Sequence, residues 1–200
     1  SQINPHFLYN TLDSIIWMAE GRKYEEVVLM TASLARLLRQ SISNEDEVVP
    51  LAREVEYAKG YLTIQKMRYK DKLEFEIDVE PSILNIPLIK LVLQPIIENA
   101  IYHGLKYKES KGLLQVKGFM KDGNAVLQVI DNGVGMDEET LSHIYDKHKV
   151  NYHSNGVGVY NVQKRLKLYY GENYGITYES EKGVGTTATI IIPGIQEESI

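Results

Sequence analysis

Three separated segments hold residues whose types and spacing could bind a nucleotide: Glu98–Ala100, Asp131–Met136 and Gly156–Asn161. In the third segment, Gly156 and Gly158 stand just before a predicted helix. Glycines in such a place let backbone N–H groups close on an anion, and the helix N-terminus adds a favourable dipole. The arrangement therefore suits a triphosphate.

Asn99 and Asp131 carry the complementary chemistry. Asn99, on a predicted helix, offers the hard oxygen that Mg²⁺ uses, since this ion takes few protein ligands and keeps phosphate and water oxygens. Asp131 follows the apolar run Val126–Ile130, where a carboxylate could accept the exocyclic amine of adenine while Gly133 and Gly135 leave room for the ring. Taken singly, each segment also has an ordinary interpretation as a turn, a flexible loop or a polar helix residue. Their order along the chain favours a nucleotide site.

His6, near the N-terminus, is a candidate acceptor for a phosphoryl group. It follows Pro5, which starts or kinks a helix, and Asn4 is placed to cap that helix. The positive end of the helix dipole disfavours an imidazolium, so we expect a neutral ring with a lone pair for attack on phosphorus. Asn10 lies one helical turn further on the same exposed strip. A lone histidine would otherwise be interpreted as a surface or capping residue.

The elements that must position His6 are helical. Apolar residues recur at three- and four-residue spacing from Pro5 to about Tyr69, with Gly21 interrupting the first helix and a turn at residues 43 to 50. Two amphipathic helices bury too little alone, so we expect the hairpin to form a four-helix bundle as a homodimer. The apolar residues expected to face that bundle are Leu8, Leu12, Ile15 and Ile16.

After residue 70 the pattern changes to mixed α and β, which predicts a domain of residues 1–70 and a second of residues 71–200. The second domain should be an α/β sandwich, with helices on one face of a mostly antiparallel sheet, so the fold class is α+β. The elements expected are strands at 73–79, 114–120 and 125–130, a turn at 121–124, and helices at 87–104, 137–147 and 157–170.

Composition excludes some classes of function. The chain has no cysteine, so disulfides, thiolate metal sites and cysteine nucleophiles are excluded. Its net charge of -5, without a basic block, argues against nucleic acid or an anionic membrane as a partner. The longest apolar stretch, Ile83–Ile101, is broken by proline and polar residues and is not a membrane span. The start at Ser1 suggests a fragment of a longer polypeptide.

In this order, and together with Gly183–Thr187, the three segments resemble the N, G1 and G2 boxes of the superfamily that includes gyrase, the heat-shock chaperone, histidine kinases and MutL. Residues 71–194 carry the resemblance, which implies a Bergerat-type sandwich with ATP and Mg²⁺ as ligands. It implies that Asn99 binds the metal ion and that a lid spans about residues 137–158. The implied nucleotide contacts are Asn99, Asp131, Gly133, Gly135, Met136, Gly156, Val157, Gly158, Val159 and Thr187.

Two features point to the histidine kinases within this superfamily. One helical turn before Asn99, where hydrolytic members carry a water-activating glutamate, this chain has Pro95. We therefore expect slow hydrolysis and a different acceptor for the γ-phosphoryl group. In addition, Gln2–Leu12 resembles the LytS/YesM-type sensor histidine kinases. Downstream residues share that resemblance: Leu51, Glu54, Tyr61, Leu62, Gln65 and Arg68.

This resemblance implies a two-component sensor kinase, in which ATP phosphorylates His6 and an aspartate on a response-regulator receiver domain then takes the phosphoryl group. It also implies that Asn10 positions water for dephosphorylation of that regulator. The chain would then be a cytoplasmic fragment of a bacterial plasma-membrane sensor, joined to the membrane only through segments outside it.

Two departures from the family pattern leave catalytic roles open. Phe7 stands where many histidine kinases have an acidic residue, so the base is sought elsewhere and Glu98 is the candidate, or else a solvated residue at a helix edge. Tyr102 stands where relatives often have a phosphate-contacting lysine, and His103 or Lys106 could substitute, or be ordinary surface residues. Two rival functions follow, a nucleotide-binding pseudokinase scaffold and a gyrase-like ATPase machine.

Overall fold

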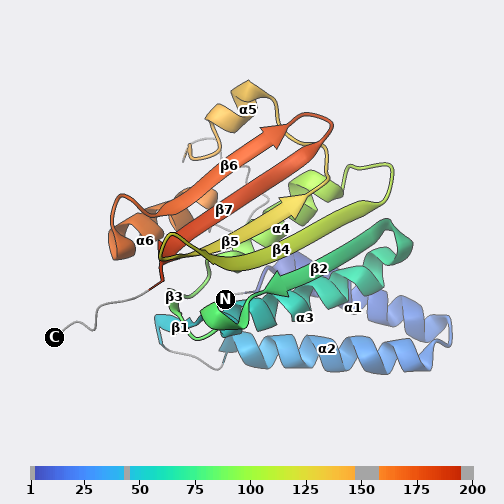
Figure 1. Cartoon of the computed structure of the whole chain (residues 1–200). Coiled ribbons are helices and arrows are strands. Elements are labelled where there is room, and N and C mark those ends of the chain that lie inside the picture. The colour runs from blue at the N-terminus through green and yellow to red at the C-terminus, as the bar shows by residue number, and fades with distance from the viewer. Residues whose placement is uncertain (1–2, 43–45, 147–157, 195–200) are drawn as a thin grey trace.

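The computed structural model describes residues 3–42, 46–146 and 158–194. A helical N-terminal region is followed by a mixed sheet with helices on one face, so the α+β class expected from the sequence is confirmed (Figure 1). None of the helices in these ranges is long and apolar enough to cross a membrane. The first three helices are α1 (Pro5–Glu20), α2 (Tyr24–Ile42) and α3 (Leu51–Tyr69).

Helix α1 begins as the sequence predicts. The Asn4 side chain accepts the backbone N–H of His6 at 2.9 Å, and Pro5 occupies the first turn. The helix ends at Glu20, with Gly21 as its C-cap. Arg22 has a φ of 56°, a left-handed conformation that turns the chain, and α2 contacts α1. α1 and α2 are therefore joined by a turn at 21–23, and α2 packs in addition against α3. The turn expected at 43–50 lies between α2 and α3, and its residues 43–45 are outside the described residues.

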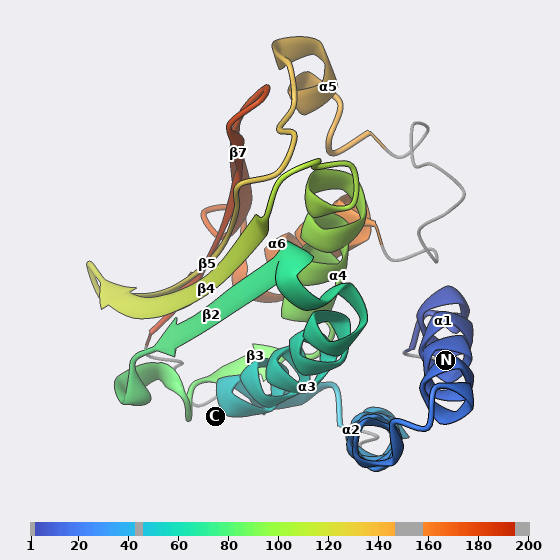
Figure 2. The same cartoon turned by 90° about the vertical axis from the view of Figure 1, so that its right-hand side faces the viewer.

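Helix α3 connects the helical region to the sheet. Ahead of it, β1 (Val48–Pro50) pairs antiparallel with β3 (Pro87–Ile89), so residues 48–50 are extended. One side of α3 packs against α2, and another packs against α4 (Leu93–Asn99) and the first strand of the main sheet (Figure 2). The domain boundary placed after residue 70 stays a prediction, because α3 contacts elements on both sides of it.

The main sheet has the strand order β2-β4-β5-β7-β6. Its β2 and β4 run parallel and the other neighbours antiparallel, as expected of a mostly antiparallel sheet. The strands are β2 (Leu73–Val79), β4 (Gly112–Lys121), β5 (Asn124–Asp131), β6 (Gly175–Glu181) and β7 (Gly185–Pro193).

A tight turn sets the register of the central strands. Lys121 pairs with Asn124, and the two residues between them, Asp122 and Gly123, have φ of 52° and 78°. Positive φ at both central positions is the type I′ geometry that matches the twist of a hairpin. This register places Asp131 at the end of β5, opposite Thr186 on β7.

The helix expected at 87–104 is shorter than predicted. Residues 87–89 form β3, Leu91 has a φ of 61°, and α4 starts only at Leu93, because a left-handed residue cannot belong to a right-handed helix. A π-helical turn at Ala100–Leu105 continues α4. The other helices of this region are α5 (Glu138–Ser142), α6 (Val159–Tyr170) and short 3-10 turns at Lys70–Lys72 and Pro81–Ile83.

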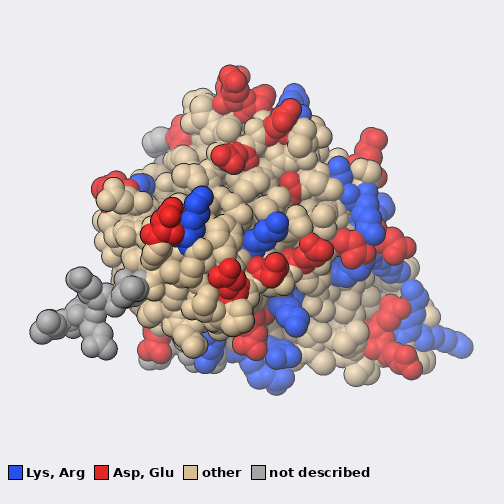
Figure 3. Space-filling model, viewed as in Figure 1, with Lys and Arg blue, Asp and Glu red and all other residues tan. Residues whose placement is uncertain are grey.

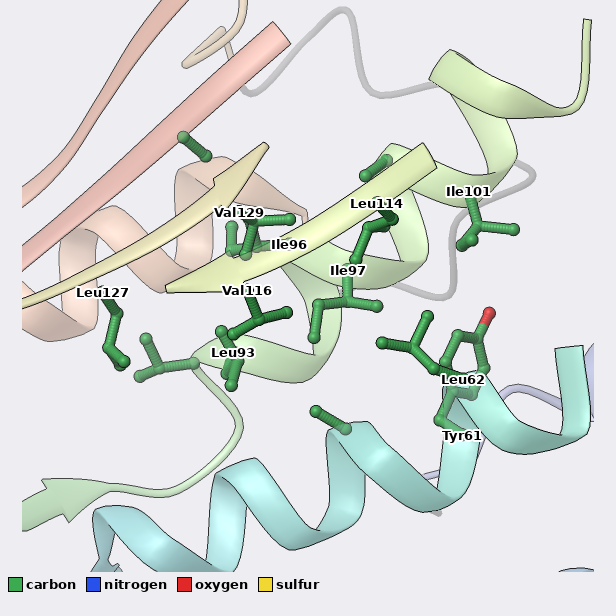
Figure 4. Packing of buried hydrophobic residues seen from close by; sticks show 14 of the residues in the cluster. Tyr61, Leu62, Leu93, Ile96, Ile97, Ile101, Leu114, Val116, Leu127 and Val129 are labelled. Atoms are coloured by element: carbon green, nitrogen blue, oxygen red, sulfur yellow. The ribbon is translucent and has the colours of Figure 1, made fainter. Parts of the chain in front are cut away.

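One hydrophobic core holds the layers together. The apolar face of α4 lies between the sheet and α3, as Figure 4 shows, and this burial is the main driving force for the layered arrangement. The side chains that meet there are Leu93, Ile96, Ile97 and Ile101 from α4 and the turn after it, Leu114, Val116, Leu127 and Val129 from the sheet, and Tyr61 and Leu62 from α3.

Charged residues mark the edge of the sheet. Glu74 on the edge strand β2 lies 2.7 Å from Lys66 Nζ and 3.3 Å from Lys111 Nζ. Figure 3 shows acidic and basic side chains interspersed over this side of the molecule. Charges on an edge strand disfavour pairing with another chain's strand.

Candidate functional site

A cavity of about 490 Å³ lies beside the inner face of the sheet, between α4, the loop after β5, α5 and the start of α6. This volume is in the range of about 300–1,000 Å³ that small-molecule sites occupy. We call it the larger cavity. Seven residues predicted from the sequence line it: Asn99, His103, Asp131, Gly135, Met136, Gly158 and Val159.

Asp131 is the buried carboxylate of this cavity, with 6% of its surface exposed. Its Oδ1 accepts the backbone N–H of Gly133 at 2.8 Å. Burial raises the pKa of Asp131 to about 6, and backbone hydrogen bonds from Gly133 and Thr186 oppose that rise. A buried acceptor at the cavity wall can select a ligand that donates a hydrogen bond, such as an exocyclic amine.

The loop that follows Asp131 packs too closely for side chains. A Cβ added at Gly133 would collide with the backbone of Gly104, and one added at Gly135, where φ is 64°, would collide with the carbonyl of Glu181. Both glycines are therefore required by close approach of backbone to backbone. Gly133 supports the loop from behind and does not itself line the cavity.

Gly104 has a role that the sequence reasoning missed. A Cβ at this position would lie 2.8 Å from Asp131 Oδ1, so glycine is what lets the carboxylate sit against the turn after α4. The Gly104 carbonyl also accepts the N–H of Val134 at 3.0 Å. A glycine inside a helical pattern is a signal of close approach that could have identified it.

The first part of the predicted lid is also at this cavity. Asp137 caps α5 by accepting the N–H of Thr140 at 2.8 Å, and Glu139, Thr140 and His143 line the cavity. The sequence reasoning named none of these three as contacts. The rest of the predicted lid at residues 147–157, which includes Gly156 and Val157, lies outside the described residues.

Thr187 corrects one expectation. It lines a groove on the other face of the sheet and does not line the larger cavity, whereas Thr186 and Ala188 do line that cavity. Successive side chains of a strand point to opposite faces, so a shift of one residue moves a side chain through the sheet.

A second cavity of about 270 Å³ lies between the start of α1, α3 and α4, and we call it the smaller cavity. His6, Asn10, Glu98 and Lys106 line it, so the residues predicted for acceptor chemistry lie together. Asn99 and His103 line the larger cavity as well as the smaller one. The two cavities therefore adjoin at Asn99 and His103 within one chain.

His6 is exposed and held in place by its neighbours. The Asn10 amide nitrogen lies 3.2 Å from His6 Nδ1 and 3.3 Å from Nε2, and the ring of Tyr102 packs edge-on at 6.0 Å between centroids. Phe7, the residue that departs from the family pattern, is 5% exposed, and its ring centroid lies 4.8 Å from that of Tyr61. Phe7 thus anchors the turn of α1 that carries His6 to α3.

Ionisable groups around the smaller cavity are perturbed. Burial raises the pKa of Glu98, whose Oε1 accepts the Gln94 amide at 3.0 Å, a bond that opposes the rise. Desolvation and the nearby Lys106 lower the pKa of His103, which favours a neutral ring. Lys106 itself lies 4.3 Å from the centre of the Tyr102 ring and lines the smaller cavity, not the larger one.

Comparison with known proteins agrees with this geometry. Residues 1–73 match the histidine kinase family, and residues 85–196 match the family of histidine kinase-, DNA gyrase B-, and HSP90-like ATPases. The sensor histidine kinase YesM of Bacillus subtilis is 35% identical over 96% of this chain and 32% of its own length. The sensor protein LytS of Oceanobacillus iheyensis is 33% identical over 86% of this chain and 30% of its own. The chain thus spans about a third of these relatives.

Solved structures agree at the level of the fold. The histidine kinase domain of the blue-light activated histidine kinase EL346 from Erythrobacter litoralis has a TM-score of 0.53 at 15% identity, covering 92% of this chain and 93% of its own. A mycobacterial sensor histidine kinase, MprB, has a TM-score of 0.53 at 21% identity, covering 74% and 96%. Because the second match covers more than half of the chain, the chain belongs to the family of histidine kinase-, DNA gyrase B-, and HSP90-like ATPases.

Proposed function

We propose that this chain is the kinase fragment of a two-component sensor, which transfers the γ-phosphoryl group of ATP to its own His6. The observation that carries the proposal is the wall that the two cavities share. Asn99 and His103 separate the cavity suited to a nucleotide from the one that contains His6. The donor and the acceptor of a phosphoryl group would thus lie on either side of one short stretch of helix.

The larger cavity would bind ATP with the adenine at its buried end. Asp131 would accept the exocyclic amine, as a buried carboxylate favours adenine over guanine, which has a carbonyl in that position. Gly156 and Gly158, before α6, would place backbone N–H groups and a helix N-terminus at the phosphates. Asn99 would then lie at the end of the nucleotide closest to the smaller cavity.

The donor set fits a magnesium ion held with the nucleotide. Among the described residues, no group of three or more histidine, cysteine or acidic side chains could hold a metal alone. Asn99 offers one hard oxygen, and Mg²⁺ in kinases is bound by few protein ligands together with phosphate oxygens. When bound, this ion would neutralise charge that develops on the phosphates.

The transfer itself needs one bond to form and one to break. An unprotonated nitrogen of His6 attacks the γ-phosphorus, the P–N bond forms, the bond to the β,γ-bridging oxygen breaks, and ADP leaves. Asn10 can orient the ring, because its amide reaches the imidazole nitrogens. Tyr102 restricts the ring from the α4 side.

Glu98 is the proposed acceptor for the proton that the imidazole loses. It lines the cavity that contains His6, and its raised pKa makes its carboxylate a stronger base than an exposed glutamate. Phe7 points into the core and cannot take this role.

Partners follow from the same proposal. Phosphorylated His6 would pass its group to an aspartate on a receiver domain, and Asn10 would position water in the reverse, dephosphorylating reaction. Exposed apolar side chains on α1 and α2 support a homodimer, since burying them would remove apolar surface from water. They include Leu12, Ile16, Trp17, Val28 and Leu29. The membrane would be reached only through segments of the longer protein.

The test is labelling with γ-labelled ATP and magnesium. We expect label on the protein that is acid-labile and alkali-stable, as a phosphoramidate is, and no label on a His6→Ala variant. A matched control is Asp13→Asn, since Asp13 is exposed on the same helix. Equal labelling of His6→Ala would refute the proposal. Release of inorganic phosphate without label on the protein would instead identify a gyrase-like ATPase. Binding of ATP with neither labelled protein nor released phosphate would identify a nucleotide-binding scaffold.

A further inference from the structure

The segment between β3 and α4 is a strained turn. Leu91 has a φ of 61°, which is unfavourable for a branched side chain. Two residues later α4 begins, and this helix carries Glu98 and Asn99. A residue in such a conformation persists only when its surroundings hold it there, and here groups from two other helices bind the backbone of the turn.

A carboxylate from α3 binds one side of the turn. Glu54 Oε1 accepts the N–H of Leu91 at 2.5 Å, and Oε2 accepts those of Leu93 at 2.9 Å and Val92 at 3.3 Å. Only 8% of Glu54 is exposed. One side chain, distant in sequence, therefore satisfies three consecutive backbone donors at the start of α4.

A guanidinium from α6 binds the other side. Arg165 donates to the carbonyl of Lys90 at 2.7 Å and to that of Leu91 at 3.3 Å. Glu54 and Arg165 thus hold the donors and the acceptors of the same turn from two different helices. We call this arrangement the α4 clamp.

Both carboxylate oxygens of Glu54 accept backbone N–H groups, as an ionised carboxylate can and a protonated one, with one O–H donor, does less well. Burial raises the pKa of Glu54, and the backbone hydrogen bonds only partly oppose that rise. A charged acceptor makes shorter and stronger hydrogen bonds than a neutral one, which fixes geometry more tightly.

We propose that Glu54 is a positioning residue for phosphoryl transfer, which acts with Arg165 to aim Glu98 and Asn99 at the two cavities. The inference rests on the proposed function of those cavities. α4 is short, so the clamp is only about 7–8 Å from Glu98 along the helix axis, at 1.5 Å per residue. A displacement of the turn would therefore reach the transfer site almost undiminished.

The clamp also links the site to the helical hairpin. α3 packs against α2, where Gly60 lies against Leu37. A movement of α2 would shift α3, and Glu54 would transmit the shift to α4. This gives the hairpin a direct mechanical route to the residues at the boundary between the cavities.

The experiment compares Glu54→Gln with Glu56→Gln in the same chain. Glu56 is a matched control, since it is exposed on the same helix and contacts only Arg36 among the bonds that the described residues show. ATP affinity is measured by nucleotide titration and the transfer rate by single-turnover labelling of His6. Because a misplacement of about 1 Å can cost about 100-fold in rate, we expect Glu54→Gln to transfer at least about tenfold more slowly.

We further expect the affinity of Glu54→Gln for ATP without Mg²⁺ to stay within about threefold of the wild type, since no hydrogen bond among the described residues joins Asp131 or its loop to the clamp. Arg165→Gln should likewise transfer the phosphoryl group more slowly while its ATP affinity stays nearly unchanged. Unchanged transfer in either folded variant would overturn the inference, as would a parallel loss of affinity and rate. A wild-type chain that does not label at all would instead refute the proposed function.

Discussion

Replacing Asp131 by asparagine should stabilise the nucleotide-free protein while weakening ATP binding. The folded-state pKa of Asp131 is about 6, against an ordinary value of 3.8. The native state therefore retains a proton that the unfolded chain releases between these values. The free energy of unfolding therefore falls as pH rises through this range, and the whole loss of stability is present at pH values above it. Asparagine keeps the shape of the side chain and carries no charge to bury.

The magnitude follows from the size of the shift. A shift of about two units corresponds to about 3 kcal/mol at pH 8 and roughly half of that at pH 5. The asparagine amide can accept from only one of the two backbone N–H groups, those of Gly133 and Thr186. The hydrogen bond that the variant loses lowers its gain in stability by about 1 kcal/mol. We therefore expect Asp131→Asn to be more stable by about 2 kcal/mol at pH 8, and by less than about 1 kcal/mol at pH 5.

The assay is thermal unfolding without nucleotide, followed by circular dichroism at both pH values. For a chain of this size, about 2 kcal/mol corresponds to a rise in Tm of roughly 4–8 °C. Asp137→Asn is the matched control, because Asp137 is an exposed helix cap and asparagine caps helices equally well. ATP affinity of Asp131→Asn should fall at least about tenfold, since the adenine amine loses its acceptor.

Two results would refute this reasoning about Asp131. One is a variant that is less stable than the wild type at pH 8, or whose advantage is the same at pH 5. The other is unchanged ATP affinity, which would mean that the carboxylate does not contact the base.

Two further predictions concern the neighbours of the cavities. Gly104→Ala should fold but bind ATP at least about tenfold more weakly, because the new Cβ would lie 2.8 Å from Asp131 Oδ1 and displace the carboxylate. Wild-type ATP affinity of this variant in a nucleotide titration would contradict the prediction. A mixture of His6→Ala and Asn99→Ala chains should remain unlabelled by γ-labelled ATP, since His6 and Asn99 of one chain line the same cavity. Labelling of the Asn99→Ala chain in that mixture would show transfer between chains.

Local features of this protein could be predicted from its sequence. The Asn4 cap and Pro5 start of α1, the Lys121–Asn124 turn and the strand that ends at Asp131 depend on residues close together in the chain. Backbone preferences and alternating apolar residues are enough to specify them. The chemistry of the nucleotide boxes was evident for the same reason, because glycines and polar residues stand at short, fixed spacings.

Other local predictions failed where packing overrode a pattern. The helix expected from Pro87 starts later, because residues 87–89 pair with β1 and Leu91 is held in a left-handed conformation by the α4 clamp. Thr187 was expected to contact the nucleotide but does not line the larger cavity, since a motif gives the neighbourhood of a strand residue and not the face to which its side chain points.

Only the tertiary structure decided which distant residues meet. Nothing in the spacing of His6 and Asn99 indicates that they line one cavity, or that Gly104 makes room for Asp131. The partnership of Glu54 with the turn before α4 is of the same kind. Such contacts arise because burial of the apolar faces of α3 and α4 determines how the layers stack, and a periodicity along one segment carries no information about its partner.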